Sequence, residues 1–274
     1  MKANNSVLKF VRKIFFRGKS KKSSEQLGKL QEVISYRFKD GHYLRHALTH
    51  KSFVSQDDVK GLLSNERLEF LGDSVINCLV TEYLYFTHPD KSEGQLSKIK
   101  SLVVSRKILG EIAQGIDLGK FLIMGPSEEK SGGRLRMSTI SNAFEAVLGA
   151  VYLDGGLNAC KRMLEQFLFG RIEDFLKDES NTNYKSKILE IAQRDGFGIP
   201  QYVTVDAIGP DHAKQFKVKI VIGGVEMGEG TGPNKKIAQQ FAAQNAALNY
   251  DKEIIEKIKN SRTKGDQEDE LLSQ

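Results

Sequence analysis

The chain has 274 residues, 39% hydrophobic and 28% charged, with a formal net charge of +6. This composition is typical of a folded globular protein, argues against a disordered chain, and leaves room for one large domain or two ordinary ones. No apolar run reaches the roughly eighteen residues that a membrane span needs, and the two cysteines form neither a disulfide framework nor a C-x-x-C pair.

Residues 1–28 form a basic N-terminal extension whose first acidic residue is Glu25. Apolar residues recur between Val7 and Phe15, but charges interrupt them, which disfavours a secretory signal. Three interpretations stay open: a solvated basic tail, an extra arm for RNA or a membrane surface, and an organelle transit peptide. Because the cysteine usage fits a reducing compartment, we expect a cytoplasmic protein, with the transit peptide as the alternative.

Apolar residues recur at every third or fourth position through residues 29–178, and glycines and His88-Pro89 punctuate the segments. No strand-like alternation of apolar and polar residues stands out in this part of the chain. The sequence therefore predicts an all-α domain over residues 29–178.

Three carboxylates, Glu66, Glu69 and Asp73, fall within eight residues of one predicted helix. At about 100° per residue they share one narrow arc, while the apolar side chains gather on the opposite side. Surface helices usually offset such acids with a lysine at i+4, but the only base within this run, Arg67, points elsewhere. A solvated charged face is the plain interpretation, and a cation site is the other.

A second predicted helix presents Glu145, with Asn142 three residues earlier on the same face. Two helices that each present oxygen ligands could share a hard cation, and Mg²⁺ prefers oxygen ligands while keeping waters for substrate phosphates. Such a site would suit phosphodiester hydrolysis, because the metal activates water and stabilises charge at phosphorus.

A polar stretch near residue 180 predicts a linker, and the pattern changes after it. Three segments of alternating apolar and polar residues lie between two helical segments, which predicts a small α+β domain in the order α-β-β-β-α. The predicted division of the whole chain is: extension 1–28, helical domain 29–178, linker 179–182, α+β domain 183–252, charged tail 253–274.

The run NERLEFLGDS at 65–74 resembles the signature of ribonuclease III, the double-strand-specific endoribonuclease. Four further blocks resemble that family in order: ALTHKS at 47–52, SEGQLSKIKSLVV at 92–104, EEKSGGR at 128–134 and FEAVLGAVYLDGG at 144–156. The α-β-β-β-α segment resembles the double-stranded-RNA-binding domain of bacterial members. The resemblance covers roughly residues 29–250, and it implies a ribonuclease III-like helical fold followed by that domain.

The resemblance also implies roles for the acids. Asp73 and Glu145 match the active-site pair, Glu69 and Asn142 join them as metal ligands, and Glu66 and Glu93 match two further catalytic acids. The fourth ligand is usually an aspartate in this family. Because Asn142 offers an oxygen without a charge, we expect weaker metal affinity or a shifted metal requirement.

For RNA binding, the resemblance implies a phosphate-binding pair, Lys235 and Lys236, at the start of the last helix, where free N–H groups already favour anions. It also implies groove contacts by Ser186, Glu190, Gln193 and, in the loop 209–212, His212. In the helical domain, Lys130 and Arg134 lie in or beside a glycine-containing loop that is either a phosphate clamp or ordinary solvated surface.

The function that the resemblance implies is hydrolysis of double-stranded RNA by a homodimer, with Phe70 at the dimer interface and Mg²⁺, or Mn²⁺ as a substitute, as the cofactor. No small-molecule cofactor is expected. Products would carry 5′-phosphate and 3′-hydroxyl ends with short 3′ overhangs, and ribosomal RNA precursors, messenger and transfer RNA transcripts would be substrates. The alternative is a catalytically weak or inactive double-stranded-RNA-binding relative.

Overall fold

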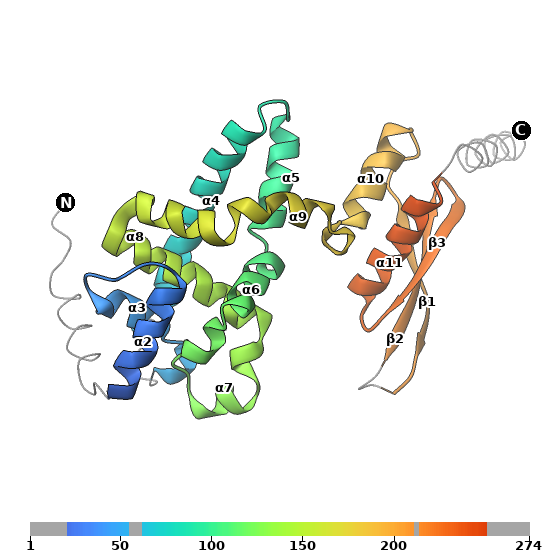
Figure 1. Ribbon diagram of the computed structural model, residues 1–274. Helices are drawn as coiled ribbons and strands as arrows, with labels where there is room; N and C mark the ends of the chain where they lie inside the picture. Colours follow the sequence, from blue (N-terminus) through green and yellow to red (C-terminus); the bar gives the residue numbers. More distant parts are fainter. Residues whose placement is uncertain (1–20, 55–61, 211–213, 251–274) are drawn as a thin grey trace, which may run out of the picture. The chain divides into compact units, whose positions relative to one another are not determined.

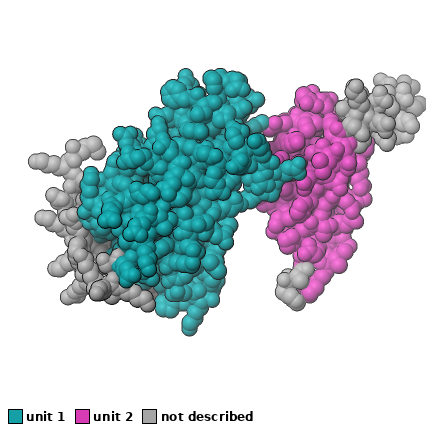
Figure 2. All heavy atoms as spheres, in the orientation of Figure 1, with its two compact units in different colours: residues 1–181 teal, residues 182–274 magenta. Residues whose placement is uncertain are grey.

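The computed structural model of the protein describes residues 21–54, 62–210 and 214–250. The chain divides into two compact units, residues 1–181 and 182–274, which Figure 2 distinguishes by colour. The N-terminal extension up to residue 20, His212, and the predicted tail lie outside the described residues. Among the described residues, no helix combines the length and the apolar character that crossing a bilayer requires.

The first unit is helical, as predicted from its 3.6-residue periodicity (Figure 1). Its helices are α2 (Lys21–Val33), α3 (Gly41–Ala47), α4 (Glu66–Thr87), α5 (Glu93–Val103), α6 (Arg106–Gly115), α7 (Pro126–Lys130), α8 (Met137–Phe167) and α9 (Ile172–Lys177). Short 3₁₀ turns connect them at Lys51–Phe53, Leu118–Phe121, Gly133–Leu135, Phe169–Arg171 and Glu179–Asn181. Helix α2 begins eight residues before the predicted start of the domain, and Leu30 from this helix is fully buried in the core.

Local sequence signals set several helix ends. Ser92 and Gln95 form a reciprocal capping box at the start of α5, and the Ser105 hydroxyl accepts a hydrogen bond from the Ile108 N–H at the start of α6. Helix α4 ends at Thr87, just before the His88-Pro89 pair, because proline lacks the N–H that would continue the helical bonding.

Helix α8 is the central element of this unit, and side chains from several other helices bury against it. Ala143, Phe144, Val147 and Val151 of α8 are at most 1% exposed and belong to one continuous apolar core. A kink at Gly156, whose φ is +75°, bends the helix, and glycine adopts this left-handed conformation without strain.

Asp154 lies next to the kink and ties α8 to the loop between α2 and α3. Its carboxylate accepts hydrogen bonds from the Tyr36 hydroxyl at 2.7 Å and from the backbone N–H groups of Lys39 and Asp40 at 2.9 and 3.0 Å. The same contact raises the pKa of the Tyr36 phenol, with burial as the larger cause. This acid therefore has a structural role, distinct from that of the acids nearer the start of α8.

The second unit confirms the predicted order α-β-β-β-α. It comprises α10 (Tyr184–Arg194), β1 (Gln201–Ile208), β2 (Gln215–Ile222), β3 (Val225–Gly232) and α11 (Lys235–Leu248). The strands form one antiparallel sheet in the order β1-β2-β3. The buried core joins strand residues such as Val218 and Ile220 to Ile188 of α10 and to the alanines of α11.

Candidate active site and RNA-binding surface

Helices α4 and α8 cross at two glycines, and this crossing brings their polar residues together. A β-carbon added at Gly72 would clash with the backbone carbonyl of Glu145, and one added at Gly149 would clash with the carbonyl of Leu68. Only glycine permits so close an approach of two helix backbones. The acids of α4 therefore lie beside Glu145, about seventy residues further along the chain.

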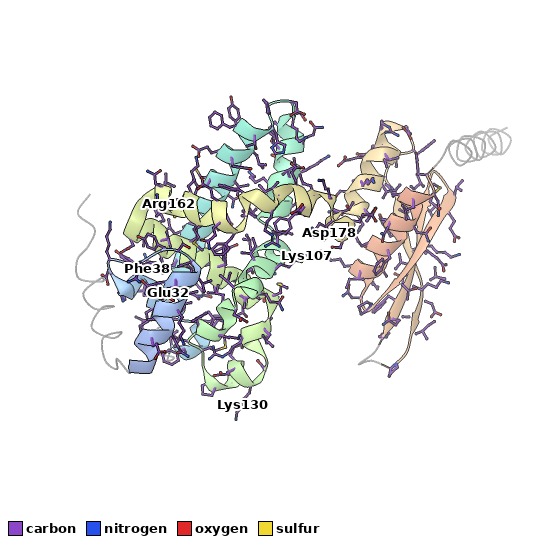
Figure 3. All side chains as sticks on the ribbon, in the orientation of Figure 1. Glu32, Phe38, Lys107, Lys130, Arg162 and Asp178 are labelled. Carbon is purple, nitrogen blue, oxygen red and sulfur yellow. The ribbon has the colours of Figure 1, made fainter. Side chains whose placement is uncertain are left out.

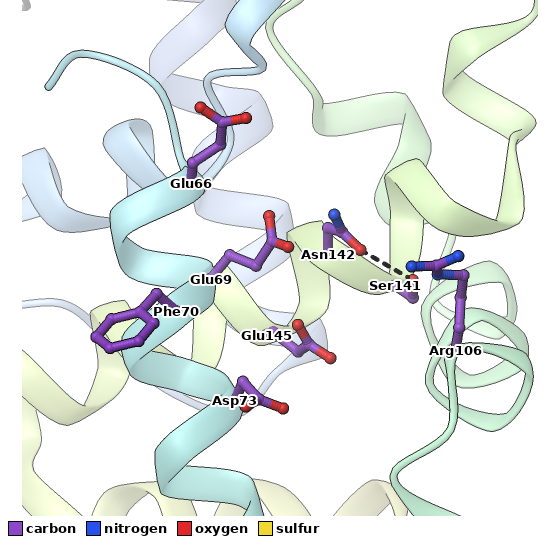
Figure 4. A pocket seen from close by; sticks show the side chains of 8 residues that line it. All are labelled: Glu66, Glu69, Phe70, Asp73, Arg106, Ser141, Asn142 and Glu145. Atoms are coloured by element: carbon purple, nitrogen blue, oxygen red, sulfur yellow. Dashed lines mark hydrogen bonds between the residues drawn. The ribbon is translucent and has the colours of Figure 1, made fainter. Parts of the chain in front are cut away.

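A pocket of about 530 Å³ lies at this crossing. Figure 4 shows Glu66, Glu69 and Asp73 along α4, with side chains of α8 beside them and Arg106 of α6 on the other side of the pocket. The lining consists of Glu66, Glu69, Phe70, Asp73, Arg106, Ser141, Asn142 and Glu145. Five of the six acids and amides predicted for catalysis or metal binding are thus in one pocket.

The sixth predicted residue, Glu93, is elsewhere. It is the first residue of α5, where its carboxylate accepts a hydrogen bond from the Ser97 hydroxyl at 2.8 Å, and it does not line the pocket. Among the described residues, Glu93 is therefore the one predicted acid that the structure does not place in the pocket.

Glu145 is half-buried, and its environment disfavours the charged form. Burial, followed by repulsion from Asp73 and Glu69, raises its pKa from 4.5 to about 7, and the charge of Arg106 opposes this shift. Burial also raises the pKa of Glu69, and a hydrogen bond from Asn142 partly offsets the effect. Mutual repulsion of this kind makes the pocket favourable for a cation.

The remaining acids of α4 have neighbours that hold their side chains. Glu66 receives a hydrogen bond and ion pair from Lys51 at 3.1 Å and a longer hydrogen bond from the Ser64 hydroxyl at 3.3 Å. The Asn77 amide donates to the Asp73 carboxylate at 3.0 Å. Both acids therefore have defined orientations.

Asn142 lies between Glu69 and Ser141 in the pocket. Its amide opposes the rise in the pKa of Glu69, and its oxygen accepts a hydrogen bond from the Ser141 hydroxyl at 3.4 Å. To place its oxygen on a cation shared with Glu69, the amide would have to rotate about its terminal bond. In the structure, the Asn142 amide favours the charged form of Glu69.

The donor set of the pocket fits a hard divalent cation. Its carboxylate, amide and hydroxyl oxygens are the ligand types that such a cation prefers. Within the described residues, no three histidine, cysteine or acidic side chains are already gathered as a closed metal site. An open arrangement of this kind suits a cation that keeps several waters, such as Mg²⁺.

The two basic residues predicted for a phosphate clamp, Lys130 and Arg134, have different surroundings. Lys130 is exposed at the end of α7, where Figure 3 shows it pointing away from the helices. Arg134 instead donates to the carbonyls of Gly119 and Leu122, at 3.0 and 2.6 Å, and to the Glu129 carboxylate at 2.7 Å. Its guanidinium thus ties the loop to the helical core.

In the second unit, the predicted RNA contacts of α10 lie on one exposed face: Ser186, Glu190 and Gln193 are spaced by four and three residues. Lys235 and Lys236 are exposed in the first turn of α11, which begins after Asn234. The Asn234 side chain caps this helix by accepting from the Ile237 N–H at 3.0 Å. Exposed lysines at a capped helix N-terminus form a favourable site for phosphate.

Phe70 is 77% exposed and stands at the edge of the pocket. Further along α4, Tyr85 and Phe86 are also exposed, at 67% and 73%, and their rings meet edge to face at 5.3 Å. Large apolar side chains with this much exposure commonly mark an interaction surface.

Two lining residues, Arg106 and Ser141, were not predicted from the sequence. Arg106 follows the N-cap Ser105 in an ordinary helix start, and no local pattern connects Arg106 to acids more than thirty residues earlier. Its position could be found only from the packing of α6 against α8.

Comparison with known proteins assigns each unit to a known domain family. A family model described as Ribonuclease-III-like matches residues 40–172, and one described as Double-stranded RNA binding motif matches residues 184–250. Ribonuclease 3 of Pelotomaculum thermopropionicum is 40% identical over 229 residues, which cover 84% of this chain and 95% of that protein. Ribonuclease 3 of Caldanaerobacter subterraneus subsp. tengcongensis is 44% identical over 217 residues, which cover 79% and 95%.

Among solved structures, the nuclease domain of ribonuclease III from Campylobacter jejuni matches with a TM-score of 0.48 and 40% identity, over 51% of this chain and 93% of that one. The two family matches lie in the order of the two units described above. The chain therefore belongs to the metal-dependent ribonuclease III family, as an endoribonuclease of double-stranded RNA whose helical nuclease domain precedes a double-stranded-RNA-binding domain.

Proposed function

We propose that the pocket between α4 and α8 is the catalytic centre and that it uses Mg²⁺, with Mn²⁺ as a substitute. The observation that carries this proposal is the convergence of Glu66, Glu69, Asp73 and Glu145 on one open pocket. Carboxylates that raise one another's pKa form a favourable site for a divalent cation, because its charge removes their repulsion.

In this proposal Glu69, Asp73 and Glu145 hold the cation, and Asn142 joins them after rotation of its amide. A bound Mg²⁺ supplies Lewis acidity and a water of lowered pKa for attack on the phosphodiester. Glu66, which Lys51 and Ser64 orient, is the first of the three acids along α4 and is proposed as a catalytic acid. Glu93 is proposed as a further catalytic acid, although it stands outside the pocket of the single chain.

We also propose that the active form is a homodimer with Phe70 at its interface. Its support is the exposure of Phe70, which would place an aromatic ring of 77% exposed surface in water if the chain were alone. Two copies would provide two pockets, and cleavage of both strands would yield 5′-phosphate and 3′-hydroxyl ends with short 3′ overhangs.

The second unit is proposed to hold the duplex through Lys235 and Lys236 on phosphates and through Ser186, Glu190 and Gln193 in the minor groove. The narrow major groove of A-form RNA excludes side chains, so shape and 2′-hydroxyl contacts dominate recognition. Lys130 is proposed as an additional phosphate contact. The substrates we propose are cytoplasmic precursors of ribosomal RNA and other structured transcripts.

Cleavage of end-labelled double-stranded RNA tests the catalytic proposal. We expect discrete products in Mg²⁺, none with chelator, and none from single-stranded RNA. Glu145→Gln should abolish cleavage, whereas Glu32→Gln, which removes a carboxylate on the exposed side of α2, should not. Tight binding without cleavage in either metal would contradict the proposal and favour an inactive RNA-binding relative.

A further inference from the structure

The basic side chain of the pocket, Arg106, has no role in the proposed metal site. Arg106 is the first residue of α6 and is exposed, and among the eight lining residues, all of them described, it is the only cation. Within the described part of the chain, its guanidinium has no hydrogen bond and no ion pair. Two other basic side chains of this unit do have partners. Lys107 donates hydrogen bonds to Ser180 and Asn181, and Arg134 forms an ion pair with Glu129.

The guanidinium faces the acids without touching them. Its charge affects Glu69 and Glu145 through space, yet it forms no ion pair with either within 4.0 Å. Figure 4 shows Arg106 on the opposite side of the pocket from the acid row of α4. The guanidinium of Arg106 and the carboxylates of α4 therefore lie on opposite sides of a pocket of about 530 Å³.

A metal ion alone does not account for this arrangement, because an arginine repels it. An anion alone does not account for it either, because the carboxylates repel the anion. A phosphate group accompanied by a divalent cation compensates both the arginine and the carboxylates. The pocket has room for both groups, because its volume of about 530 Å³ is many times the roughly 30 Å³ that one water molecule occupies in the liquid.

We propose that Arg106 binds a non-bridging oxygen of the RNA phosphate in the pocket, opposite the carboxylates that hold the cation. The planar guanidinium offers paired N–H donors that match phosphate oxygens, and its charge cannot be lost at physiological pH. Arg106 thereby orients the phosphate toward the acid row and stabilises the negative charge that develops there during hydrolysis. This inference rests on the proposed catalytic role of the pocket.

The test compares wild type, Arg106→Gln, Arg106→Lys and Arg37→Gln under single-turnover conditions at saturating Mg²⁺ and several salt concentrations. Arg37 is an exposed arginine that does not line the pocket. Arg106→Gln should lower kcat/KM by roughly 10- to 100-fold, as expected for a lost hydrogen bond to a charged group. Arg106→Lys should retain part of the activity, and Arg37→Gln should stay within about twofold of wild type.

Two further readouts separate phosphate contact from other effects. The slope of log kcat/KM against log salt should be less steep by about one unit in Arg106→Gln, because one phosphate contact is gone. Sulfur in place of one non-bridging oxygen at the cleaved phosphate should slow the wild type, and Arg106→Gln should lose that penalty for one of the two diastereomers. Unchanged melting temperatures would confirm that the variants fold.

Wild-type kcat/KM in Arg106→Gln would overturn the inference. A lower rate with unchanged salt slope and unchanged sulfur penalties would also overturn it, since Arg106 would then act on the carboxylates and not on the phosphate. Failure of the proposed function is distinguishable, because in that case the wild type itself would not cleave in Mg²⁺.

Discussion

Gly72 of α4 lies directly against the backbone carbonyl of Glu145 in α8. This contact sets the distance between the two helices that carry the acids. Glu69 and Asp73 lie close to Gly72 on α4, and the carbonyl that Gly72 contacts belongs to Glu145 itself. The spacing of the carboxylates in the pocket therefore depends on a backbone contact, and side-chain packing elsewhere cannot replace it.

Gly72→Ala should destabilise the nuclease domain and lower its activity. The added methyl group forces α4 and α8 apart, and overpacking of this kind costs about 3 kcal/mol. A displacement of about 1 Å at a catalytic group can reduce the rate roughly a hundredfold. Denaturant unfolding and single-turnover cleavage would measure both effects.

Gly28→Ala is the matched control, because a β-carbon at Gly28 in α2 meets nothing within 4 Å. It should be neutral or stabilise the protein by up to about 1 kcal/mol, since alanine favours the helix over glycine. Equal stability of Gly72→Ala and wild type would contradict the role assigned to the crossing.

Without divalent cations, the protein should become less stable as the pH rises through neutrality. Glu145 has a pKa of about 7 in the folded state, against 4.5 ordinarily. Between these values the folded state binds more protons than the unfolded state, so the free energy of unfolding falls with rising pH. The stabilisation is complete below about pH 4.5 and is lost above about pH 7.

Glu145→Gln tests this directly, because glutamine cannot ionise. In chelator at pH 8 the variant should be more stable than wild type, by on the order of 2 kcal/mol after allowance for solvent screening of a half-buried group. At pH 5 the two should differ little. Thermal unfolding at both pH values would measure the difference, and a larger advantage of the variant at pH 5 would contradict the prediction.

Asn142→Asp should strengthen metal binding and weaken the metal-free protein. The added carboxylate supplies a charged ligand, so half-maximal activity should require less Mg²⁺. It also replaces an amide that favours the charged form of Glu69 with a carboxylate that repels it, which should lower the melting temperature in chelator. A Mg²⁺ titration of the cleavage rate, together with melting curves with and without Mg²⁺, would measure both changes.

Asn142→Ala separates the two roles of the amide. If Asn142 serves only to orient Glu69, alanine should raise the Mg²⁺ requirement modestly and aspartate should not lower it. If neither substitution changes the Mg²⁺ requirement, Asn142 is neither a ligand nor a determinant of the Glu69 position.

The sequence predicts both folds and most of the pocket, and the reasons it stops short are physical. Helical periodicity placed Glu66, Glu69 and Asp73 on one face, because residues on one helix have a fixed angular relation. No such relation connects Arg106 to those acids, and none reveals that Arg134 is bonded to Gly119 and Leu122. These contacts depend on how separate helices pack.

Lys107 should hold the turn Glu179–Asn181 on the nuclease domain. Its ammonium group donates to the Ser180 carbonyl at 3.2 Å, the Ser180 hydroxyl at 2.8 Å and the Asn181 side-chain oxygen at 2.6 Å. Figure 3 labels Lys107 beside Asp178, whose carboxylate in turn accepts from the Ser180 N–H at 2.9 Å. One lysine thus closes a set of hydrogen bonds around the turn Glu179–Asn181.

Lys107→Met removes these donors and keeps most of the side-chain volume. Losing them should cost this turn about 1 kcal/mol, so amide hydrogen exchange over residues 178–181 should accelerate about fivefold. Lys120→Met is the control, because Lys120 pairs with Asp117 at 2.6 Å and has no contact with the linker. Equal exchange in both variants would show that the backbone bonds of the turn suffice, whereas selective acceleration would establish that Lys107 holds the turn Glu179–Asn181 on the nuclease domain.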